Sequence, residues 1–590
     1  MNYSSIPAAQ TVVLHCKAKG IRDIVISPGS RNAPLTLGFT EDPYFNCYSI
    51  VDERSAAFFA LGMAQQLQRP VVALCTSGSA LLNYYPAIAE AYYSAIPLVV
   101  LSADRPFYKI DVGDGQTIRQ DHVFDRHIGY SANLRQDVSH AKEKVKKYAP
   151  QNIIGNVKEL QESIQSYNDN ELNKALNLAY DQRLPVHINV PFEEPLYGKV
   201  VEPIVSPKVE INKKEATVLP ELDTFVQHWN SAKRKMVLVG VNFPNLIEQQ
   251  FLDVLAQDPS VIVFTETTSN IHNPEFFPSI DSIIAPIEKS NHENQLFGDL
   301  QPEILLTFGG LVVSKKVKAF LRAYKPKQHW HIDELRANDT FFALTHHFKT
   351  KVNHFFTSFL PRVHNVESEY ADYWKGIKLA YEANRKTYLQ SIPFSDLLAF
   401  KHIFDKIPED IQLQMANSST IRYAQLFDSK PSVEVFCNRG TSGIDGSVST
   451  AIGASIANGK QTVLITGDLG FFYDSNGLWN NYMKPNFRII LINNDGGGIF
   501  RILPGLEKSA NYENYFETTH NLNAEHLCTM FGLEYSSVND VKSLENELGE
   551  FFGSSIIPKL LEIRTPRILN NKILMGYFDF ISSGIINHIH

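Results

Sequence analysis

The sequence predicts an α/β protein in which three domains each carry a parallel sheet flanked by helices. Short runs of Val, Ile and Leu occur without polar alternation, as expected for strands buried on both faces of a parallel sheet. Helical patterns separate these runs, which is typical of βαβ units. The chain of 590 residues exceeds one hydrophobic core, and roughly 150 residues per domain suggests three or four units.

The first predicted domain covers residues 1–195, where each apolar run ends in Gly, Ser or Asp before the next helix. Loops of this kind gather on one edge of the sheet. A linker with Pro and Lys but no periodicity follows over 199–220. The second predicted domain covers 221–364 and the third covers 390–590, with a helical bridge near 365–390 between them.

Two strand ends in the third domain predict a metal site. One buried strand ends in Gly467-Asp468 and the next ends near Asn494, with an amphipathic crossover between them. A right-handed βαβ unit places both ends on the same sheet edge. A carboxylate, an amide oxygen and a backbone carbonyl near Gly496 form a hard oxygen set of the kind that Mg²⁺ prefers. Either dipeptide alone is equally well explained as an ordinary turn, so the prediction depends on both occurring at this spacing.

A carboxyl group, Glu53, begins the predicted helix in SIVDERSAAFFALGMA. An acidic residue in the first turn of a helix is also explained by the helix dipole alone. The apolar residues that follow at once would raise the pKa of this carboxyl by desolvation. Farther along, the small residues of 438–459 predict a helix that approaches its sheet closely.

Composition limits the partners and the compartment. The net charge of -8 and the pI near 6.2 argue against a general nucleic-acid surface. Five scattered cysteines without a CxxC pair fit a reducing compartment. We expect no signal peptide, because the N-terminus lacks a basic segment followed by an apolar one. No apolar run reaches the roughly 18 residues that a membrane span needs. The expectation is a cytoplasmic protein without a nucleic-acid or membrane partner.

Several motifs resemble thiamine-diphosphate-dependent decarboxylases and carboligases: GSA after a strand, SGIDG, GDL and NNDGGGIF, together with Glu53. The resemblance implies a thiamine-diphosphate-binding fold of pyrimidine, central and diphosphate domains, with Mg²⁺ or Mn²⁺ held by Asp468, Asn494 and the Gly496 carbonyl. It implies that Glu53 hydrogen-bonds the cofactor's pyrimidine ring and that Ile444 wedges beneath the cofactor. The implied cofactor contacts are Glu53, Gly443, Ile444, Gly467, Asp468, Leu469, Gly470, Asn494 and Gly496. Gly470 departs from the family, where a hydroxyl residue is expected.

More narrowly, ISPGSRNAPL, VDERSAAFFALGMA, SADRP, GQTIRQ and NRGTSGIDG resemble the 2-succinyl-5-enolpyruvyl-6-hydroxy-3-cyclohexene-1-carboxylate synthase family of menaquinone biosynthesis. The resemblance implies decarboxylation of 2-oxoglutarate and conjugate addition of the succinyl unit to isochorismate. Both substrates keep carboxylates, which arginine forks match best. The implied catalytic residues are Glu53, Ser30, Arg31 and Gln116. The implied substrate contacts are Arg105, Lys315, Lys316, Ser418, Arg422, Arg439, Ile499, Phe500 and Leu503.

Competing interpretations remain for these residues and for the whole chain. Each arginine could form a surface ion pair, and the apolar residues could belong to the core. Lys316 stands where the family has an arginine, so Lys315 and Lys316 could equally be a solvated helix start. The family implies a dimer or tetramer in which Glu53 and the metal lie on different subunits. The alternative functions are a decarboxylase or carboligase of the acetohydroxyacid synthase type, and a cofactor-binding regulatory protein without turnover.

Overall fold

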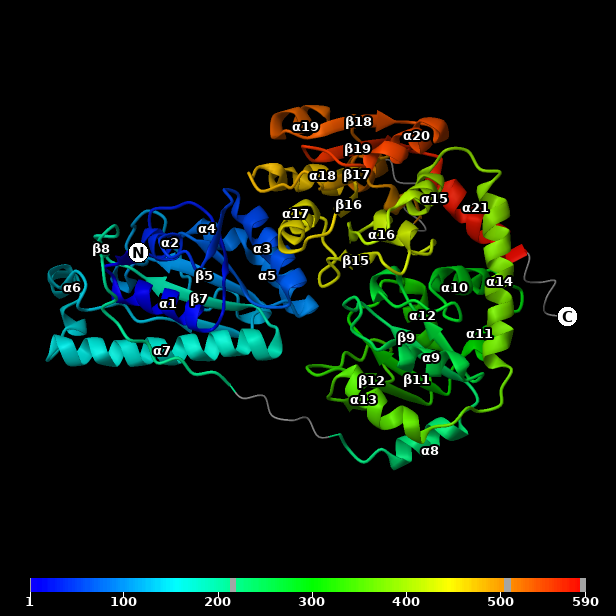
Figure 1. Cartoon of the computed structure of the whole chain (residues 1–590), viewed down its shortest axis with the longest axis horizontal. Coiled ribbons are helices and arrows are strands. Elements are labelled where there is room, and N and C mark those ends of the chain that lie inside the picture. Colours follow the sequence, from blue (N-terminus) through cyan, green and yellow to red (C-terminus); the bar gives the residue numbers. More distant parts are fainter. Residues whose placement is uncertain (1, 213–218, 503–510, 584–590) are drawn as a thin grey trace. The chain divides into compact units, whose positions relative to one another are not determined.

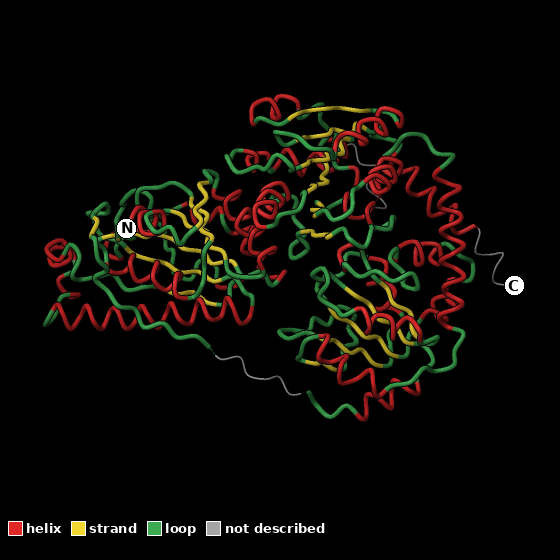
Figure 2. Tube along the Cα trace, in the orientation of Figure 1, coloured by secondary structure: helices red, strands yellow, loops and turns green. Residues whose placement is uncertain are grey.

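The computed structural model describes residues 2–212, 219–502 and 511–583 and contains two compact units (Figure 1). Unit 1 comprises Met1–Lys214, Gly440–Thr462 and Gly470–Phe487. Unit 2 comprises Glu215–Arg439, Val463–Leu469 and Arg488–His590. Figure 2 shows helices flanking the strands of each main sheet. The predicted α/β class with parallel sheets is thereby confirmed.

Unit 1 is built on a six-stranded sheet in the order β3-β2-β4-β5-β7-β6, in which every strand pair is parallel. The strands are β2 (Asp23–Ile26), β3 (Asn46–Ser49), β4 (Val71–Cys75), β5 (Leu98–Asp104), β6 (Tyr130–Asn133) and β7 (Val186–Pro191). The inner strands β2, β4 and β5 are buried throughout, as non-alternating apolar runs predict. A short antiparallel pair joins β1 (Tyr3–Ser4) to β8 (Lys199–Val200).

The helices of unit 1 are α1 (Pro7–Ala18), α2 (Ala33–Thr40), α3 (Glu53–Leu67), α4 (Ser79–Asn83), α5 (Tyr85–Ser94), α6 (Lys142–Tyr148), α7 (Val157–Gln182) and α17 (Ser447–Ala457). Helices α3 and α17 cross at two glycines. A Cβ on Gly62 would lie 2.0 Å from the carbonyl oxygen of Thr450, and a Cβ on Gly453 would lie 2.0 Å from that of Phe59. The small residues of 438–459 therefore serve a close helix–helix crossing, whereas the sequence predicted an approach to the sheet.

Unit 2 contains a five-stranded parallel sheet in the order β10-β9-β11-β12-β13. Its strands are β9 (Lys235–Val239), β10 (Val261–Phe264), β11 (Ile304–Phe308), β12 (Gln328–Ile332) and β13 (His346–Phe348). The neighbouring helices in the chain are α8 (Asp223–Ser231), α9 (Gln249–Gln257), α10 (Ile280–Glu288), α11 (Glu293–Leu300), α12 (Lys315–Ala323), α13 (Val352–Phe359) and α14 (Tyr370–Leu389). The bridge expected near 365–390 corresponds to α14.

A second, six-stranded sheet of unit 2 has the order β15-β14-β16-β17-β19-β18. Its strands are β14 (Gln412–Met415), β15 (Glu434–Cys437), β16 (Thr462–Gly467), β17 (Arg488–Asn493), β18 (Glu534–Val538) and β19 (Lys559–Arg564). The helices of this region are α15 (Asp396–Lys406), α16 (Ser419–Ala424), α18 (Asp468–Tyr473), α19 (Glu525–Phe531), α20 (Val541–Phe551) and α21 (Asn570–Ser583). Strands β16 and β17 pair in parallel, as predicted.

The crossover between β16 and β17 contains only the short α18 and a 3₁₀ turn over Ser475–Leu478. The sequence predicted a longer amphipathic segment there. The division into two compact units does not test the boundaries of the three predicted domains, which remain a prediction. Across the described residues, no helix is both long and apolar enough to cross a lipid bilayer.

Candidate active site

Asp468 and Asn494 meet at the edge of the second sheet of unit 2. Asp468 directly follows β16 and is 3% exposed. Its Oδ2 accepts hydrogen bonds from the backbone nitrogens of Asn494 (3.2 Å) and Gly496 (2.9 Å). Its Oδ1 accepts from the nitrogen of Leu469, at 2.6 Å. The two residues that the sequence places 26 positions apart are therefore neighbours across parallel strands.

The Asn494 side chain is oriented by a buried carboxyl. Its Nδ2 donates to Oδ2 of Asp396, 3.0 Å away, and Oδ1 of Asp396 accepts from the Thr565 hydroxyl at 2.6 Å. Burial raises the pKa of Asp396 to about 6. Within the part of the chain that the structure describes, Oδ1 of Asn494 has no hydrogen-bond partner, so this oxygen is the end of the amide left for a ligand.

The backbone at Gly496 forms two hydrogen bonds at this edge of the sheet. Its N–H points to Asp468, and its carbonyl accepts a hydrogen bond from the nitrogen of Gly498 at 3.0 Å. Among the described residues, no group of three or more His, Cys, Asp or Glu could hold a metal ion. A cation at this edge would depend on the Asp468 carboxylate, the Asn494 amide oxygen and a carbonyl. These oxygen donors fit Mg²⁺ or Mn²⁺, and the metal role of Gly496 stays a prediction.

His520 is a neighbour of Asp468 that the sequence did not single out. Its Nε2 lies 3.4 Å from Oδ2 of Asp468, and the interaction with this carboxylate raises the pKa of the imidazole. A lone histidine 52 positions after Asp468 carries no motif, so only the fold brings the pair together.

Glu53 is the first residue of α3, as predicted. The preceding Asp52 caps the helix through a hydrogen bond from the Ser55 nitrogen at 3.2 Å. Burial of the Glu53 carboxyl raises its pKa, and the charge of Asp52 raises it further. Glu53 is followed in α3 by four buried apolar residues, Ala56, Ala57, Phe58 and Phe59. Partial burial of the carboxyl thus supports the predicted rise in its pKa, whereas a solvated helix start would leave that pKa near the ordinary value.

Ile444 lies in the loop before α17 and is 36% exposed. That exposure rules out the interpretation of Ile444 as a core residue. A Cβ on the neighbouring Gly443 would lie 2.2 Å from Oδ1 of Asp445, so a side chain there would require the Asp445 carboxylate to move. Gly470, in α18, accepts a hydrogen bond from the Asp474 nitrogen at 3.2 Å through its carbonyl. The cofactor roles of these residues stay predictions.

A buried carboxylate on α5 holds the start of this loop. Glu90 is 1% exposed. Its Oε1 accepts from the nitrogen of Gly440 at 2.7 Å, and its Oε2 accepts from the nitrogen and hydroxyl of Thr441 at 2.7 and 2.9 Å. The Ser94 hydroxyl donates to the same carboxylate at 2.7 Å. No sequence pattern predicts this anchor, since Glu90 and Thr441 lie 351 positions apart.

Arg31 is buried among groups of its own unit. Its Nη1 donates to the Phe192 carbonyl at 3.0 Å, and its Nη2 pairs with the carboxylate of Glu194 at 3.1 Å. Its Nε is buried without a partner among the described residues. The Nε donor of the guanidinium is therefore left for a further acceptor. The adjacent Ser30 is exposed.

Two further predicted residues follow strand β5. The Nη2 of Arg105 donates to the carbonyl of Gly115 at 3.1 Å. Gln116 is exposed and has a left-handed backbone with φ of 56°. The buried glutamine of this segment is Gln120, whose Oε1 accepts from the Gly78 nitrogen at 2.8 Å. The motif GQTIRQ contains both glutamines, and its sequence alone did not distinguish the buried one.

Gln120 belongs to a buried polar network at the end of β5. Its Nε2 donates to Oδ1 of Asn189 at 2.8 Å, and Nδ2 of Asn189 donates to Oδ2 of Asp104 at 2.8 Å. Burial raises the pKa of Asp104 to about 7. The network fixes the loops that carry Arg105 and Gly78.

In unit 2, Ser418, Arg422 and Arg439 lie at the ends of strands β14 and β15. Ser418 precedes α16 with φ of 70°, a conformation that non-glycine residues seldom adopt. The Nη1 of Arg439 donates to Oδ1 of Asn417 at 2.6 Å. Burial lowers the pKa of Arg422, and Arg439 is among the charges that act on it. The two predicted arginines are therefore close to each other in the same unit.

Lys315 and Lys316 begin α12, as the interpretation of a helix start required. Lys315 is exposed, and Lys316 forms an ion pair with Glu288. Ile499 and Phe500 lie in a 3₁₀ turn and are partly buried. Leu503 falls outside the described residues.

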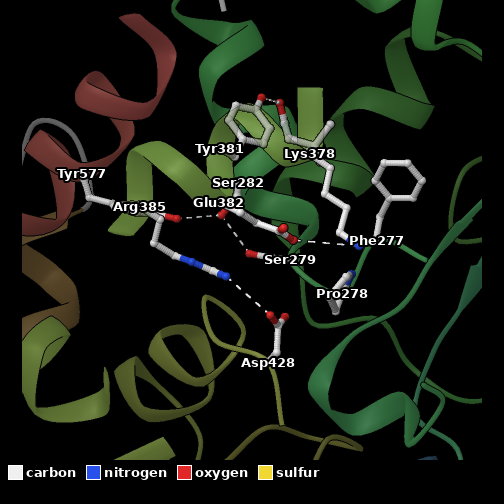
Figure 3. A pocket seen from close by; sticks show the side chains of 11 residues that line it. Phe277, Pro278, Ser279, Ser282, Lys378, Tyr381, Glu382, Arg385, Asp428 and Tyr577 are labelled. Carbon is white, nitrogen blue, oxygen red and sulfur yellow. Dashed lines mark hydrogen bonds and ion pairs between the residues drawn. The ribbon is translucent and has the colours of Figure 1, made fainter. Parts of the chain in front are cut away.

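Unit 2 also has a narrow recess away from the predicted residues, lined by residues of α10, α14 and α21 (Figure 3). Arg385 points toward Asp428, with 3.4 Å between Nη2 and Oδ2. The Ser282 hydroxyl bonds both Ser279 (2.8 Å) and Tyr577 (3.0 Å). These polar groups form hydrogen bonds and an ion pair with one another. None of the predicted site residues lines the recess, so we do not assign it to the predicted site.

Two family models match the chain: the thiamine pyrophosphate enzyme N-terminal TPP binding domain over residues 6–127, and the corresponding C-terminal TPP binding domain over residues 417–563. The fold is shared with the crystal structure of benzoylformate decarboxylase from Polynucleobacter necessarius, at a TM-score of 0.69 and 14% identity over 95% of this chain and 99% of that one. A putative thiamin diphosphate-dependent enzyme from Mycobacterium smegmatis gives a TM-score of 0.66, also at 14% identity with the same coverage. Fold and motifs together define a thiamine-diphosphate-dependent enzyme.

Comparison with curated relatives identifies the family within this class of enzymes. The 2-succinyl-5-enolpyruvyl-6-hydroxy-3-cyclohexene-1-carboxylate synthase of Christiangramia forsetii is 54% identical over 99% of this chain and 100% of its own length. The synthase of Flavobacterium psychrophilum is 53% identical over 98% and 99%, and that of Porphyromonas gingivalis is 37% identical over 98% of both. The chain belongs to this synthase family.

Proposed function

We propose that the protein decarboxylates 2-oxoglutarate and transfers the succinyl unit by conjugate addition to isochorismate, as a step of menaquinone biosynthesis. The observation that carries the proposal is the meeting of Asp468 and Asn494 at one sheet edge, in a chain that matches named synthases from end to end. A thiamine-diphosphate enzyme needs such an oxygen set for the cation that accompanies its diphosphate.

The proposed cofactor site uses Asp468, Asn494 and Gly496 for Mg²⁺ or Mn²⁺, and Ile444 for apolar contact with the cofactor. Two features support it: Oδ1 of Asn494 is held outward by the bond from Nδ2 to Asp396, and the Ile444 side chain is exposed although apolar. When bound, thiamine diphosphate supplies the electron sink for loss of carbon dioxide.

Glu53 is the proposed acid–base residue. Its raised pKa favours a protonated carboxyl closer to neutral pH, so the group can donate a proton and take it back. Asp52 and the first turn of α3 fix the position of this carboxyl. The apolar side chains that follow it limit access of water.

The proposed substrate contacts are cationic because both substrates keep carboxylates. Arg422 and Arg439 lie together in unit 2, and Arg31 and Arg105 lie in unit 1 with Ser30 and Gln116. Ile499 and Phe500 offer apolar contacts. An enzyme of the acetohydroxyacid synthase type acts on less anionic substrates and would not need these cations.

The deciding experiment measures carbon dioxide release from 2-oxoglutarate and from pyruvate, with thiamine diphosphate and Mg²⁺, and then product formation with isochorismate. We expect release from 2-oxoglutarate and product only when isochorismate is present. Preference for pyruvate would favour the acetohydroxyacid synthase alternative. Cofactor binding without turnover of any ketoacid would favour the regulatory alternative.

We further propose a homodimer or homotetramer in the cytoplasm. The family resemblance supports self-association, with Glu53 and the metal site supplied by different subunits. Five free cysteines, four of them buried, support a reducing compartment. Light scattering on the purified protein gives the number of subunits, and a monomer that is fully active would contradict the shared site.

A further inference from the structure

Glu517 is a buried residue of unit 2 whose carboxylate pairs with two arginines. Nε of Arg501 donates to Oε1 of Glu517 at 2.5 Å, and Nη2 of Arg501 donates to Oε2. Nη1 of Arg567 also donates to Oε2, at 2.8 Å. The contact between Arg501 and Glu517 is therefore bidentate, a geometry that fixes the direction of both side chains.

A second carboxylate balances the charge of this cluster. Both Nη1 and Nη2 of Arg567 lie 3.2 Å from Oε1 of the exposed Glu513 and donate to it. Nη2 of Arg501 lies 4.0 Å from the same oxygen. Two guanidinium groups thus face two carboxylates. Because removal of one partner of a buried ion pair leaves a charge without compensation, the cluster is stable only when its members are complete.

The backbone of Glu517 holds the segment before Arg501. The nitrogen of Gly497 donates to the carbonyl of Glu517 at 2.6 Å. The 3₁₀ turn over Gly498–Ile502 therefore begins next to a backbone contact with Glu517 and contains, at Arg501, a side-chain contact with the same residue. The two apolar residues proposed to contact the acceptor lie between these two contacts.

One of these apolar residues, Phe500, lies near a proposed cofactor contact. A Cβ on Gly497 would lie 3.2 Å from Cδ2 of Phe500 and 3.3 Å from Cδ1 of Leu469. Both side chains therefore border the same space at Gly497. The Phe500 ring also packs edge to face against Phe516, the residue before Glu517, with 6.1 Å between the ring centroids. The position of Phe500 thus depends on the segment that carries Glu517.

We propose that Glu517, through Arg501, is a positioning residue that aligns the turn carrying Ile499 and Phe500 for the acceptor. The inference rests on the proposed function for the identity of this acceptor, isochorismate. The carbonyl of Glu517 holds the end of the turn next to the proposed metal site, and its carboxylate holds the end beyond Phe500. Loss of the carboxylate alone therefore disturbs the acceptor step and leaves cofactor binding intact.

The test changes the carboxylate and keeps the backbone contact. Glu517→Gln keeps the size of the side chain without its charge, and Glu517→Asp keeps the charge on a shorter side chain. Arg501→Lys weakens the same contact from the other side, because an ammonium cannot form the fork. This variant leaves Glu517 paired with Arg567, so it carries the test if Glu517→Gln does not fold. Glu534→Gln is the matched control, since Glu534 pairs with Lys559 at 3.1 Å at the start of β18.

Four measurements separate the steps. Amide hydrogen exchange at 498–502 reports on the turn without any substrate. Calorimetry gives the affinity for thiamine diphosphate in the presence of Mg²⁺. Single-turnover release of carbon dioxide from 2-oxoglutarate, without isochorismate, reports on the first half of the reaction. The steady-state kcat/KM for isochorismate reports on the second half.

We expect Glu517→Gln and Arg501→Lys to exchange faster at 498–502. Their kcat/KM for isochorismate should fall about 10- to 100-fold, since a small displacement of a substrate contact reduces rates on this scale. Cofactor affinity and single-turnover release of carbon dioxide should stay close to those of the unmodified protein. Glu517→Asp should recover part of the loss, because it keeps the charge that Arg501 pairs with.

Unchanged exchange at 498–502 or an unchanged kcat/KM for isochorismate in both variants would overturn the inference. Equal losses in the two halves of the reaction, a matching loss of cofactor affinity, or the same loss in Glu534→Gln would also overturn it. Lack of carbon dioxide release from 2-oxoglutarate by the unmodified protein would instead contradict the proposed function. The exchange rates would still test the contact between Glu517 and the turn in that case.

Discussion

Asn494 is locked by Asp396, a residue 98 positions earlier in the chain, through a hydrogen bond of 3.0 Å from Nδ2 to Oδ2. An asparagine amide can rotate to present either its nitrogen or its oxygen. The bond to Asp396 selects the oxygen for the outer side. The Asp396 carboxyl, which is not itself a proposed metal ligand, therefore determines whether this edge can hold a cation.

Asp396→Ala should lower the affinity for thiamine diphosphate in the presence of Mg²⁺ by roughly 10- to 100-fold, since loss of an outer partner releases a metal ligand. Calorimetric titration of the cofactor at fixed Mg²⁺ measures the change. Asp405→Ala is the control, because Asp405 lies at the exposed end of the same helix. Equal affinities of Asp396→Ala and the unmodified protein would contradict the orienting role.

Asp468→Ala should abolish the rise in melting temperature that thiamine diphosphate and Mg²⁺ produce together. Ligands stabilise a protein only as far as they bind its folded state, and Asp468 is the one proposed ligand that carries a full charge. Differential scanning fluorimetry gives the shift for each addition. A full shift in the variant would remove Asp468 from the metal site.

Glu53→Gln should leave folding and cofactor binding nearly unchanged while turnover falls by about 10²- to 10⁴-fold, the usual contribution of an acid–base group. The amide keeps the size of the carboxyl but cannot exchange the proton. Glu159→Gln is a matched control, because Glu159 also lies in the first turn of a helix but is exposed. Retained turnover in Glu53→Gln would exclude the acid–base role.

Glu90→Ala should lower the stability of unit 1 and loosen the loop at Gly440 and Thr441. Four partly buried donors, from Gly440, Thr441 and Ser94, lose their acceptor, and each one that water cannot reach costs about 1–3 kcal/mol. Urea unfolding followed by circular dichroism measures the loss, and amide hydrogen exchange at 440–441 locates it. Unchanged exchange rates there would show that the carboxylate does not hold the loop.

Acidification should destabilise unit 2 through His329. Its Nε2 bonds the buried Thr307 hydroxyl at 2.8 Å, and burial lowers the pKa of the imidazole from 6.5 to about 4. The unfolded chain binds the proton more readily, so the stability from neutral His329 is complete above pH 6.5 and is lost as the pH falls toward 4. The loss amounts to up to about 3 kcal/mol.

In His329→Gln, the urea midpoint should fall less steeply than in the unmodified protein between pH 6.5 and 4. His526→Gln, at an exposed site on α19, is the reference substitution. Parallel pH profiles for His329→Gln and the unmodified protein would show that His329 does not titrate differently in the two states.

The sequence predicted the parts of the fold that are long and apolar. The strand ending in Gly467 and the strand ending near Asn494 are Ile-rich and bounded by turn residues, so their pairing followed from general rules of parallel sheets. Strands β13 (His346–Phe348) and β14 (Gln412–Met415) escaped prediction because they are short and mostly polar in sequence.

The sequence predicted local structure near the candidate site where a short pattern decides it, while the roles of the site residues remain predictions. Glu53 begins a helix because Asp52 is a good cap. His520 and Asp396 were missed because their partners Asp468 and Asn494 lie 52 and 98 positions away, so only the fold brings them together.

The backbones of α3 and α17 are in close contact where the two helices cross at Gly62 and Gly453. Helix α3 carries Glu53 at its first residue, and α17 follows the loop that presents Ile444. Any displacement of one helix must be transmitted to the other, so we expect Glu53 and the loop that carries Ile444 to move together. Alanine at Gly62 or Gly453 would force the backbones apart, and the damage would appear at two distant side chains together.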